Sequence, residues 1–372
     1  MSLAKTTSDE SGPSLLTRVG SAVDRATLRL LSRAFAGGDG APPLAPTRGP
    51  AELLEIGRRF YSSPETRQRY FAAPGLPAIR EAARERLPGG AVVDLSFQSP
   101  FRPLFSPVAD EYEGYIENRV VHARYLRHDR PARTLLCIHG WGGGSFWLEE
   151  RAFAARWFYR SGFDVVLAVL PFHGLRTPAQ VRFSGALFPT VNVFRTNEAF
   201  AQSLVDLRAL VAWLRARGAP EIGVAGMSLG GYTAALLASC EPGLGFAIPM
   251  IPAVSMADLL WIHGEGTPSR RRAERDGVTV EALRAMFAVH TPLEHTPLVA
   301  RERRFIVAGR ADRITPPAQA TMLWEHWERP AIHWFSGSHL LQFGRGDALR
   351  AIRRFLEGLT HTSRKNASSS AE

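Results

Sequence analysis

The sequence has little cysteine, almost no lysine and no long apolar run. Its 372 residues include two cysteines, Cys137 and Cys240, too few for a disulfide framework and without metal-ligand spacing. No window approaches roughly 18 uninterrupted apolar residues, which argues against a transmembrane helix. Residues 1–14 lack the charged-then-apolar layout of a secretory signal. These absences predict a cytoplasmic protein without a bound metal.

The basic residues are almost all arginines. Only Lys5 and Lys365 are lysines among 45 basic side chains, and the formal net charge is +10. The arginines are spread along the chain, whereas a nucleic-acid footprint would cluster them. We therefore expect no nucleic-acid partner and interpret the arginine content as a general bias in composition. The net charge still leaves weak association with anionic surfaces open.

The first 90 residues read as a helical extension and linker. In residues 14–35, apolar side chains recur at the three-and-four spacing of an amphipathic helix, with arginines on the other side. The apolar positions are Leu16, Val19, Val23, Ala26, Leu30 and Ala34. Such a basic helix predicts weak membrane-surface association, or alternatively docking on the main domain or a loose arm. Residues 37–50 read as a linker and 51–86 as further short helices.

Residues 91–359 have the pattern of an α/β domain. A lead-in pair of antiparallel strands is expected over 92–97 and 115–125. Short apolar strands then alternate with helices, which predicts a mostly parallel, doubly wound sheet. The expected strands are 133–138, 163–170, 221–225, 246–251, 304–308 and 331–335, with helices notably over 197–217 and 232–239. Residues 253–298 interrupt the alternation as a small helical lid, and the polar tail 360–372 is expected to be disordered.

Ser228 is the candidate nucleophile. It lies in the run Gly226-Met227-Ser228-Leu229-Gly230, between an apolar strand and a helix. The glycines suit a tight, strained strand-to-helix turn that lifts the serine hydroxyl clear of the sheet. The alternative is a glycine-rich turn with a structural serine, because such a short pattern also arises by chance.

A serine hydroxyl needs a base, and the base needs an acid that holds its tautomer. Asp312 and His339 each follow a predicted strand, at the sheet edge where Ser228 also lies, because reactive groups gather beyond the carboxyl ends of parallel strands. Their order in the chain, serine then acid then histidine, is the one this arrangement requires. Asp258 is an alternative acid. The competing histidines are His173, His290 and His295.

The run His139-Gly140-Trp141-Gly142-Gly143-Gly144 follows another strand and suits an oxyanion hole. We expect the Trp141 N–H, or that of Gly142, to join the Leu229 N–H there, while His139 orders the loop. The run matches neither common phosphate-binding glycine pattern. Candidate pocket residues are His139, Gly142, Met227, Phe172, His173 and Trp261. Aromatic side chains there would favour an apolar acyl or alcohol group.

Together these four motifs resemble the α/β-hydrolase superfamily over residues 92–359. Residues 170–178, with Pro171, His173 and Gly174, resemble its strand-4 segment, and with the long extension they are similar to the alpha/beta-hydrolase domain-containing 18 branch. The glycine-rich loop looks more like that of an ordinary esterase. The resemblance implies a serine hydrolase that cleaves a carboxylic ester or thioester of a small or lipid-like molecule without a cofactor. A peptidase or lipid deacylase with the same triad, and a non-catalytic ligand-binding protein, stay open, as does the oligomeric state.

Overall fold

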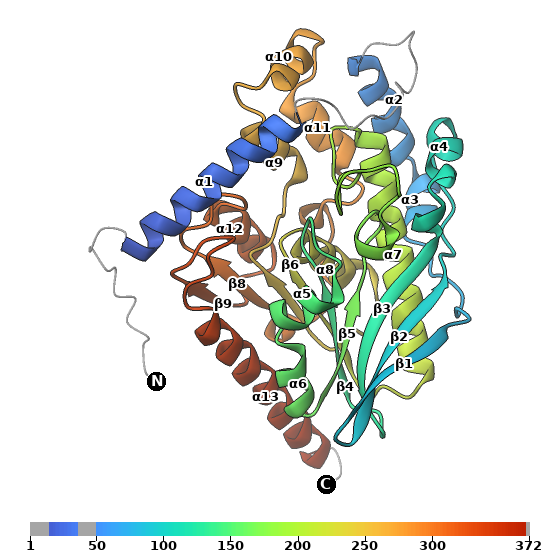
Figure 1. The fold of residues 1–372 in the computed structure, drawn as a ribbon, viewed down its shortest axis with the longest axis vertical. Coiled ribbons are helices and arrows are strands. Elements are labelled where there is room, and N and C mark those ends of the chain that lie inside the picture. The colour runs from blue at the N-terminus through green and yellow to red at the C-terminus, as the bar shows by residue number, and fades with distance from the viewer. Residues whose placement is uncertain (1–14, 36–49, 370–372) are drawn as a thin grey trace.

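The computed structural model describes residues 15–35 and 50–369. Within these residues, nine strands form one sheet in the order β1-β2-β3-β5-β4-β6-β7-β8-β9 (Figure 1). The pairs from β1 to β3 and the β3–β5 pair are antiparallel, and the pairs from β5 through β9 are parallel. The strands are β1 (Arg80–Leu87), β2 (Gly90–Gln98), β3 (Val120–His128), β4 (Arg133–Ile138), β5 (Phe163–Ala168), β6 (Ile222–Met227), β7 (Ala247–Met250), β8 (Phe305–Gly309) and β9 (Ala331–Phe335). The predicted fold class, a mostly parallel sheet with flanking helices, is confirmed.

The six predicted parallel strands lie within two residues of their observed ends. Strands β4 to β8 are almost wholly buried, because helices cover both faces of the sheet. Continuous apolar runs bounded by glycine, proline or polar residues are the usual pattern of such strands. This is why the sequence located them well.

Strand β1 corrects the prediction of short helices throughout residues 51–86. Its segment, from Arg80 to Leu87, is mostly exposed and pairs only with β2, at the edge of the sheet. Charged residues and alanines on both faces leave no alternating pattern, so local preference favours a helix. Backbone pairing with the well-patterned β2 overrides that preference. The predicted boundary at residue 90 therefore falls inside a β-hairpin.

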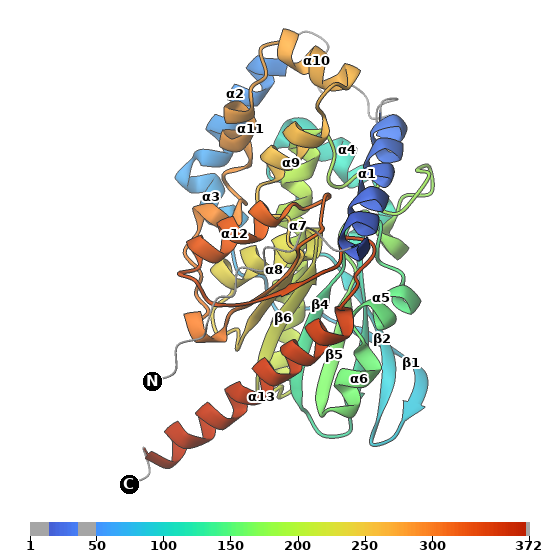
Figure 2. The same cartoon turned by 90° about the vertical axis from the view of Figure 1, so that its left-hand side faces the viewer.

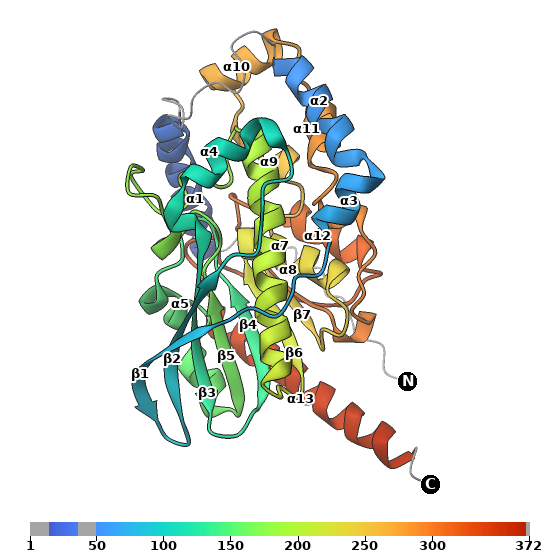
Figure 3. The same cartoon turned by 90° about the vertical axis from the view of Figure 1, so that its right-hand side faces the viewer.

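Helices cover the two faces of the sheet in two layers. One apolar cluster includes α7 (Val193–Ala216), α8 (Leu229–Cys240) and α12 (Pro317–His326). The other includes side chains from the segments of α6 (Ala155–Arg160) and α13 (Arg345–Ser369), next to α5 (Phe146–Ala152). In Figure 3, α7 runs along the whole length of its face of the sheet. A short helix, α4 (Ala109–Gly114), lies beside the upper end of α7.

The remaining helices gather at the carboxyl ends of the parallel strands. Helices α2 (Pro50–Ser62) and α3 (Pro64–Tyr70) come from the N-terminal part of the chain. They meet the predicted lid, which forms α9 (Met256–His263), α10 (Pro268–Arg275) and α11 (Val280–Phe287). Helix α11 packs against both α2 and α9, and α10 forms the outermost part of this end in Figure 1. That this segment covers the active site as a lid stays a prediction.

Helix α1 (Leu15–Phe35) is docked on the main body of the protein. Its Thr17 and Ser21 hydroxyls donate to the backbone carbonyls of Ser336 and Ala311, at 3.3 and 2.8 Å. Figure 2 shows the lower end of α1 reaching the loops that follow β8 and β9. The predicted helix is confirmed, and it is docked rather than a loose arm, whereas its association with a membrane surface stays a prediction. Of the predicted linker, only Pro50 is described, and residues 1–14 lie outside the described residues.

Helix α13 differs from the predicted disordered tail. The helix continues to Ser369 and projects from the body (Figures 2 and 3). A helix satisfies its own backbone hydrogen bonds, so it can propagate beyond the point where packing ends. Residues 370–372 lie outside the described part of the chain. In that described part, no helix is both long enough and apolar enough to cross a membrane.

Candidate active site

Ser228 sits on a strained turn between β6 and α8. Its backbone has φ 59° and ψ −114°, a region that costs about 1–3 kcal/mol for a residue with a side chain. The two flanking glycines allow this turn. A Cβ on Gly226 would lie 1.9 Å from the carbonyl oxygen of Gly230, and one on Gly230 would lie 1.9 Å from that of Ile138. Only glycine fits either position without moving backbone.

The structure brings the three predicted catalytic side chains together. The Nε2 atom of His339 lies 2.9 Å from the Ser228 Oγ, and its Nδ1 atom lies 2.8 Å from the Asp312 Oδ2. Asp312 follows β8 and His339 follows β9, on neighbouring loops at the carboxyl edge of the sheet. The arrangement has the hydrogen bonding that a serine nucleophile, a base and an orienting acid require.

Asp312 is held by the loop that carries it. Its Oδ1 accepts the backbone N–H groups of Ile314 and Thr315 at 2.9 and 2.8 Å. The Thr315 hydroxyl lies 3.0 Å from the other carboxylate oxygen and also 3.0 Å from the carbonyl of Ile251. These contacts fix the plane of a buried carboxylate and leave Oδ2 directed at His339. The acid thereby favours the tautomer in which Nδ1 of His339 carries the proton.

The alternative acid and bases are engaged elsewhere. Asp258 forms an ion pair with Arg284 at 2.7 Å, joining α9 to α11. His290 is buried and lies 2.6 Å from the Tyr232 hydroxyl and 2.8 Å from the Asn197 Oδ1. Its burial lowers its pKa well below the usual value, as expected of a neutral histidine in a structural network.

The other competing histidines are likewise bound away from Ser228. The Nε2 of His295 lies 2.8 Å from the carbonyl of Val289. His173 is fully buried, and its Nδ1 lies 2.8 Å from the carbonyl of Pro171. Burial lowers the pKa of His173 well below its usual value, and His139 and Arg176 lower it further. In the described structure only His339 contacts both Ser228 and a carboxylate.

The glycine-rich loop lies against the serine. A Cβ on Gly140 would lie 3.3 Å from the Ser228 Cβ, so the backbone of this loop runs directly beside the nucleophile. Gly142 has φ +78°, which turns the chain sharply after Trp141. Leu229 is the first residue of α8, where an N–H has no carbonyl partner within the helix. These positions suit an oxyanion hole, and the choice between Trp141 and Gly142 as second donor stays a prediction.

His139 orders this loop. Its Nδ1 lies 2.7 Å from the Gly140 carbonyl, and its Nε2 accepts the Leu170 N–H at 3.0 Å. Burial lowers the pKa of His139 to about 4, so the ring is neutral at physiological pH. This neutral ring ties the glycine-rich loop to the end of β5, and with almost no exposed surface it is not part of an open pocket.

Two further predicted pocket residues belong to the core. Phe172 is completely buried, and its ring packs edge-on against Tyr112 and Tyr115. His173 stacks obliquely on His139 and has no exposed surface. The sequence placed both at a pocket because their segment follows a strand at the site edge. The aromatic residues that precede β3 cover Phe172, and no local pattern reveals that contact.

The remaining pocket candidates are partly accessible. Met227 ends β6, and its sulfur lies 3.6 Å from the Gln342 side-chain amide, which also donates to the His339 carbonyl. Trp261, on α9, lies beneath the Arg270 guanidinium at 3.1 Å from the ring centre. This contact joins α9 to α10. A pocket role for Trp261 or Met227 stays a prediction.

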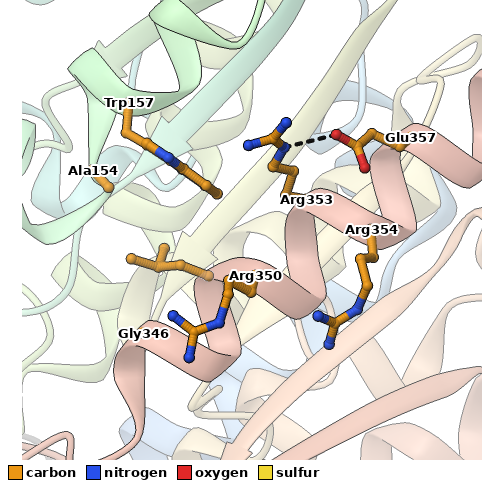
Figure 4. A pocket seen from close by; sticks show the side chains of 8 residues that line it. Ala154, Trp157, Gly346, Arg350, Arg353, Arg354 and Glu357 are labelled. Carbon is orange, nitrogen blue, oxygen red and sulfur yellow. Dashed lines mark hydrogen bonds and ion pairs between the residues drawn. The ribbon is translucent and has the colours of Figure 1, made fainter.

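A separate groove lies away from these residues. It has a volume of about 590 Å³ between α6 and α13 and contains none of the predicted site residues (Figure 4). Arg353 lies over the Trp157 ring at 5.5 Å and pairs with Glu357 at 2.7 Å. The groove is therefore an exposed arginine-lined surface beside a helix rather than a centre of chemistry.

Among the residues described, no group of three or more histidine, cysteine or acidic side chains could hold a metal ion.

Sequence reasoning missed Asp24, Ser21 and Thr315, which hold the loops of the site. Asp24 contacts the loops of both Asp312 and His339. Nothing in a single sequence links a helix near the start of the chain with loops about 300 residues later. Thr315 could have been suspected, since a hydroxyl three residues after an aspartate often caps the same turn.

The fold and the strained turn at Ser228 define the class of protein to which this chain belongs. The structure is similar to acetyl xylan esterase 1 from Thermoanaerobacterium sp. JW/SL YS485, with a TM-score of 0.56 and 17% identity over 82% of this chain and 98% of the other. Acetyl xylan esterase from Paenibacillus sp. R4 gives a TM-score of 0.57 and 15% identity, over 84% and 99%. At these identities the likeness shows the fold alone, which is that of an α/β-hydrolase.

The family follows from the sequence comparisons. The family model described as Alpha/beta hydrolase domain containing 18 matches residues 85–272. An uncharacterized protein of Mycobacterium tuberculosis strain CDC 1551 / Oshkosh is 35% identical over 322 residues, which cover 84% of this chain and 75% of the relative. An uncharacterized protein of strain H37Rv is 35% identical over 312 residues, covering 82% and 72%. The chain belongs to the Alpha/beta hydrolase domain containing 18 family, and it is an α/β-hydrolase enzyme, as the resemblance predicted.

Proposed function

We propose that the protein hydrolyses a carboxylic ester or thioester through an acyl-enzyme on Ser228. One observation carries the proposal, the hydrogen-bonded chain from Asp312 through His339 to the Ser228 hydroxyl. The esterase activity named for two proteins of similar fold supports ester chemistry. The substrate is a small or lipid-like ester.

In the proposed reaction, the Ser228 Oγ attacks the carbonyl carbon while its proton passes to the Nε2 of His339. Asp312 stabilises the imidazolium that forms. The N–H groups of Leu229 and Trp141 donate to the oxyanion. The imidazolium then gives its proton to the leaving alcohol or thiol as the acyl-enzyme forms. His339 next removes a proton from water, which attacks the carbonyl carbon of the acyl-enzyme. The imidazolium then returns this proton to the Ser228 Oγ as the bond to the acyl group breaks, which releases the carboxylic acid and restores neutral His339.

Replacement of the nucleophile tests this proposal. Ser228→Ala should abolish turnover of p-nitrophenyl acetate and covalent labelling by a fluorophosphonate, because it removes the hydroxyl from which His339 takes the proton. The matched control is Ser239→Ala, since Ser239 lies on the same helix, α8, and donates to the carbonyl of Ala235. It should retain both properties. Labelling that survives in Ser228→Ala would rule out Ser228 as the nucleophile.

Two further measurements separate the related functions. A series of p-nitrophenyl esters of increasing acyl length, with matching thioesters and a peptide substrate, measures which acyl compounds are cleaved. If the protein is acylated once and the acyl group is then not released by hydrolysis, this result would instead indicate a ligand-binding protein on a hydrolase scaffold. Sustained turnover of esters supports the proposed hydrolase.

A further inference from the structure

Helix α1 meets the candidate active site through a polar face. This face consists of Gly20, Ser21 and Asp24, all buried. A Cβ on Gly20 would lie 3.0 Å from the Ser338 Cβ, so the absence of a side chain lets the helix approach the histidine loop closely. The Ser21 hydroxyl donates to the Ala311 carbonyl at 2.8 Å, on the loop of the acid. One helix thus contacts both loops that carry the proposed base and acid.

The Asp24 carboxylate binds these two loops to each other. Its Oδ2 accepts the backbone N–H groups of Arg313 and His339, each at 3.0 Å. Its Oδ1 accepts the Ser338 hydroxyl at 2.9 Å and the Leu340 N–H at 3.2 Å. Four donors on one buried carboxylate form a charge-assisted network, which is stronger and more directional than neutral hydrogen bonds.

The positions of these donors matter for the reaction. Arg313 directly follows the proposed acid, and the other three donors belong to residues 338–340, with His339 in the middle. A shift of either loop changes the distances that His339 makes to Ser228 and Asp312, which are 2.9 and 2.8 Å. Catalytic rates are sensitive to misplacements of this kind, and about 1 Å can cost roughly 100-fold.

The described part of α1 meets these loops with polar positions. Among the described side chains of α1, Val19 is 43% exposed and Ala26 is also exposed, although both belong to the predicted apolar stripe. Three buried positions, Gly20, Ser21 and Asp24, face the loops instead. The contacts described between these three positions and the two loops include directional hydrogen bonds, which fix the orientation of the helix relative to the loops.

We propose that Asp24 is a positioning residue of the active site. It holds the loops of Asp312 and His339 at the separation needed for proton transfer, and α1 is therefore an integral part of the catalytic unit. The proposal rests on the proposed serine hydrolase function. Asp24 touches neither the substrate nor the reacting atoms, and it acts through the backbone of the two loops.

Asp24→Asn tests this role in the full-length protein. The amide keeps the size of the side chain, but it removes the charge and turns a donor toward the loop N–H groups. For p-nitrophenyl acetate we expect kcat to fall about 10- to 100-fold, with KM changed by less than about 2-fold, because the substrate contacts are untouched. The rate of fluorophosphonate labelling should fall by a similar factor, while its final extent, which counts folded sites, stays near that of the wild type. Arg25→Gln is the matched control, an exposed charge on the same helix, and should leave every value unchanged.

Gly20→Val provides an independent variant. Its added methyl groups collide with Ser338 and push α1 away from the loop, although Asp24 is still present. It should reproduce the loss of kcat. Should Asp24→Asn fail to fold, Gly20→Val and Ser338→Ala, which removes one of the four donors, decide the question through the same rates.

The outcomes separate the two proposals. If Ser228→Ala is inactive but Asp24→Asn and Gly20→Val keep wild-type kcat per labelled site, Asp24 is a structural residue only and the positioning role is wrong. A loss of activity that follows only the labelled fraction also shows a purely structural role. If Ser228→Ala remains active and labelled, the proposed function fails, and the positioning role fails with it. A fall in kcat and labelling rate per folded site, with KM preserved, supports the positioning role.

Discussion

At the scale of single residues, the candidate site depends on where a side chain is forbidden as much as on where one is present. Ser228 adopts a positive φ at the end of β6, and this turn is possible only because its glycine neighbours let three backbone segments approach. The same close approach places Gly140 beside the serine. The turn and the adjacent loop are therefore closely packed against each other.

Gly226→Ala tests this requirement. The added Cβ would lie 1.9 Å from the Gly230 carbonyl oxygen, and backbone atoms cannot rotate away as a side chain can. We expect the free energy of unfolding to fall by about 3 kcal/mol or more, and labelling by a fluorophosphonate to be lost because the turn opens. Chemical denaturation and labelling measure the two effects.

The control for this variant is Gly358→Ala. Gly358 lies within α13, and a Cβ there would meet no atom within 4 Å. Alanine is the better helix former by roughly 1 kcal/mol, so this variant should be as stable as the wild type or slightly more stable. A Gly226→Ala protein with wild-type stability and labelling would show that the turn tolerates a side chain.

The sequence predicted those site residues that follow a strand. Ser228, Asp312 and His339 each lie just beyond the carboxyl end of a strand, so strand assignment and chain order were enough to bring them together. The same reasoning put Phe172 in the pocket, although it is buried in the core, and it could not connect Asp24 with the site. Their surroundings consist of side chains and loops from distant parts of the chain, which a single sequence does not connect.

At the scale of elements, α7 holds N-terminal segments of the chain in place through hydrogen bonds to one buried side chain. Glu198 on α7 is fully buried and accepts the Tyr61 hydroxyl of α2 at 2.6 Å. It also accepts the backbone N–H groups of Leu104 and Phe105 at 2.6 and 3.2 Å. Burial raises the pKa of Glu198 to about 6, against the opposing effect of these donors.

This raised pKa predicts how stability depends on pH. A carboxyl group with a higher pKa in the folded state stabilises the fold below its unfolded pKa, and that contribution is lost as pH rises through about 6. Glu198→Gln does not titrate. The free energy of unfolding of this variant relative to the wild type should therefore rise by about 2 kcal/mol between pH 4 and pH 7. Urea unfolding across this range measures the difference.

Tyr61→Phe is the companion to that experiment. It removes one donor to Glu198 but leaves the carboxyl group in place, so its stability relative to Glu198→Gln should still fall as pH rises through this range, as that of the wild type does. A constant difference between Glu198→Gln and the wild type from pH 4 to pH 7 would show that the pKa of Glu198 is the same in the folded and unfolded states.

Prediction of elements from the sequence succeeded where one pattern dominated. Strands β4 to β8 are almost wholly buried and mostly apolar, and α7 and α8 were recognised with errors of a few residues. Strand β1 was missed because its exposed, charged residues carry no alternating signal. Edge strands of this kind are defined by the partner strand and not by their own side chains.

At the scale of the whole molecule, the N-terminal residues form two parts with different roles. Helix α1 contacts the loops of Asp312 and His339 mainly through polar groups. Helices α2 and α3 instead contribute to the main apolar cluster, where Tyr61 and Tyr70 are each 1% exposed. The predicted extension over residues 1–90 thus combines a helix that serves the site with helices that complete the core.

Two truncations distinguish these parts. Deletion of residues 1–49 removes α1 and should leave a folded protein with slow turnover, because the sheet and its apolar layers remain. Deletion of residues 1–72 also removes Tyr61 and Tyr70. Each buried aromatic contributes about 3–5 kcal/mol, and the total stability of a protein is about 5–15 kcal/mol, so this variant should not fold. Circular dichroism and thermal unfolding compare the two proteins. A cooperative transition in the shorter one at the wild-type temperature would mean that α2 and α3 are separable from the core.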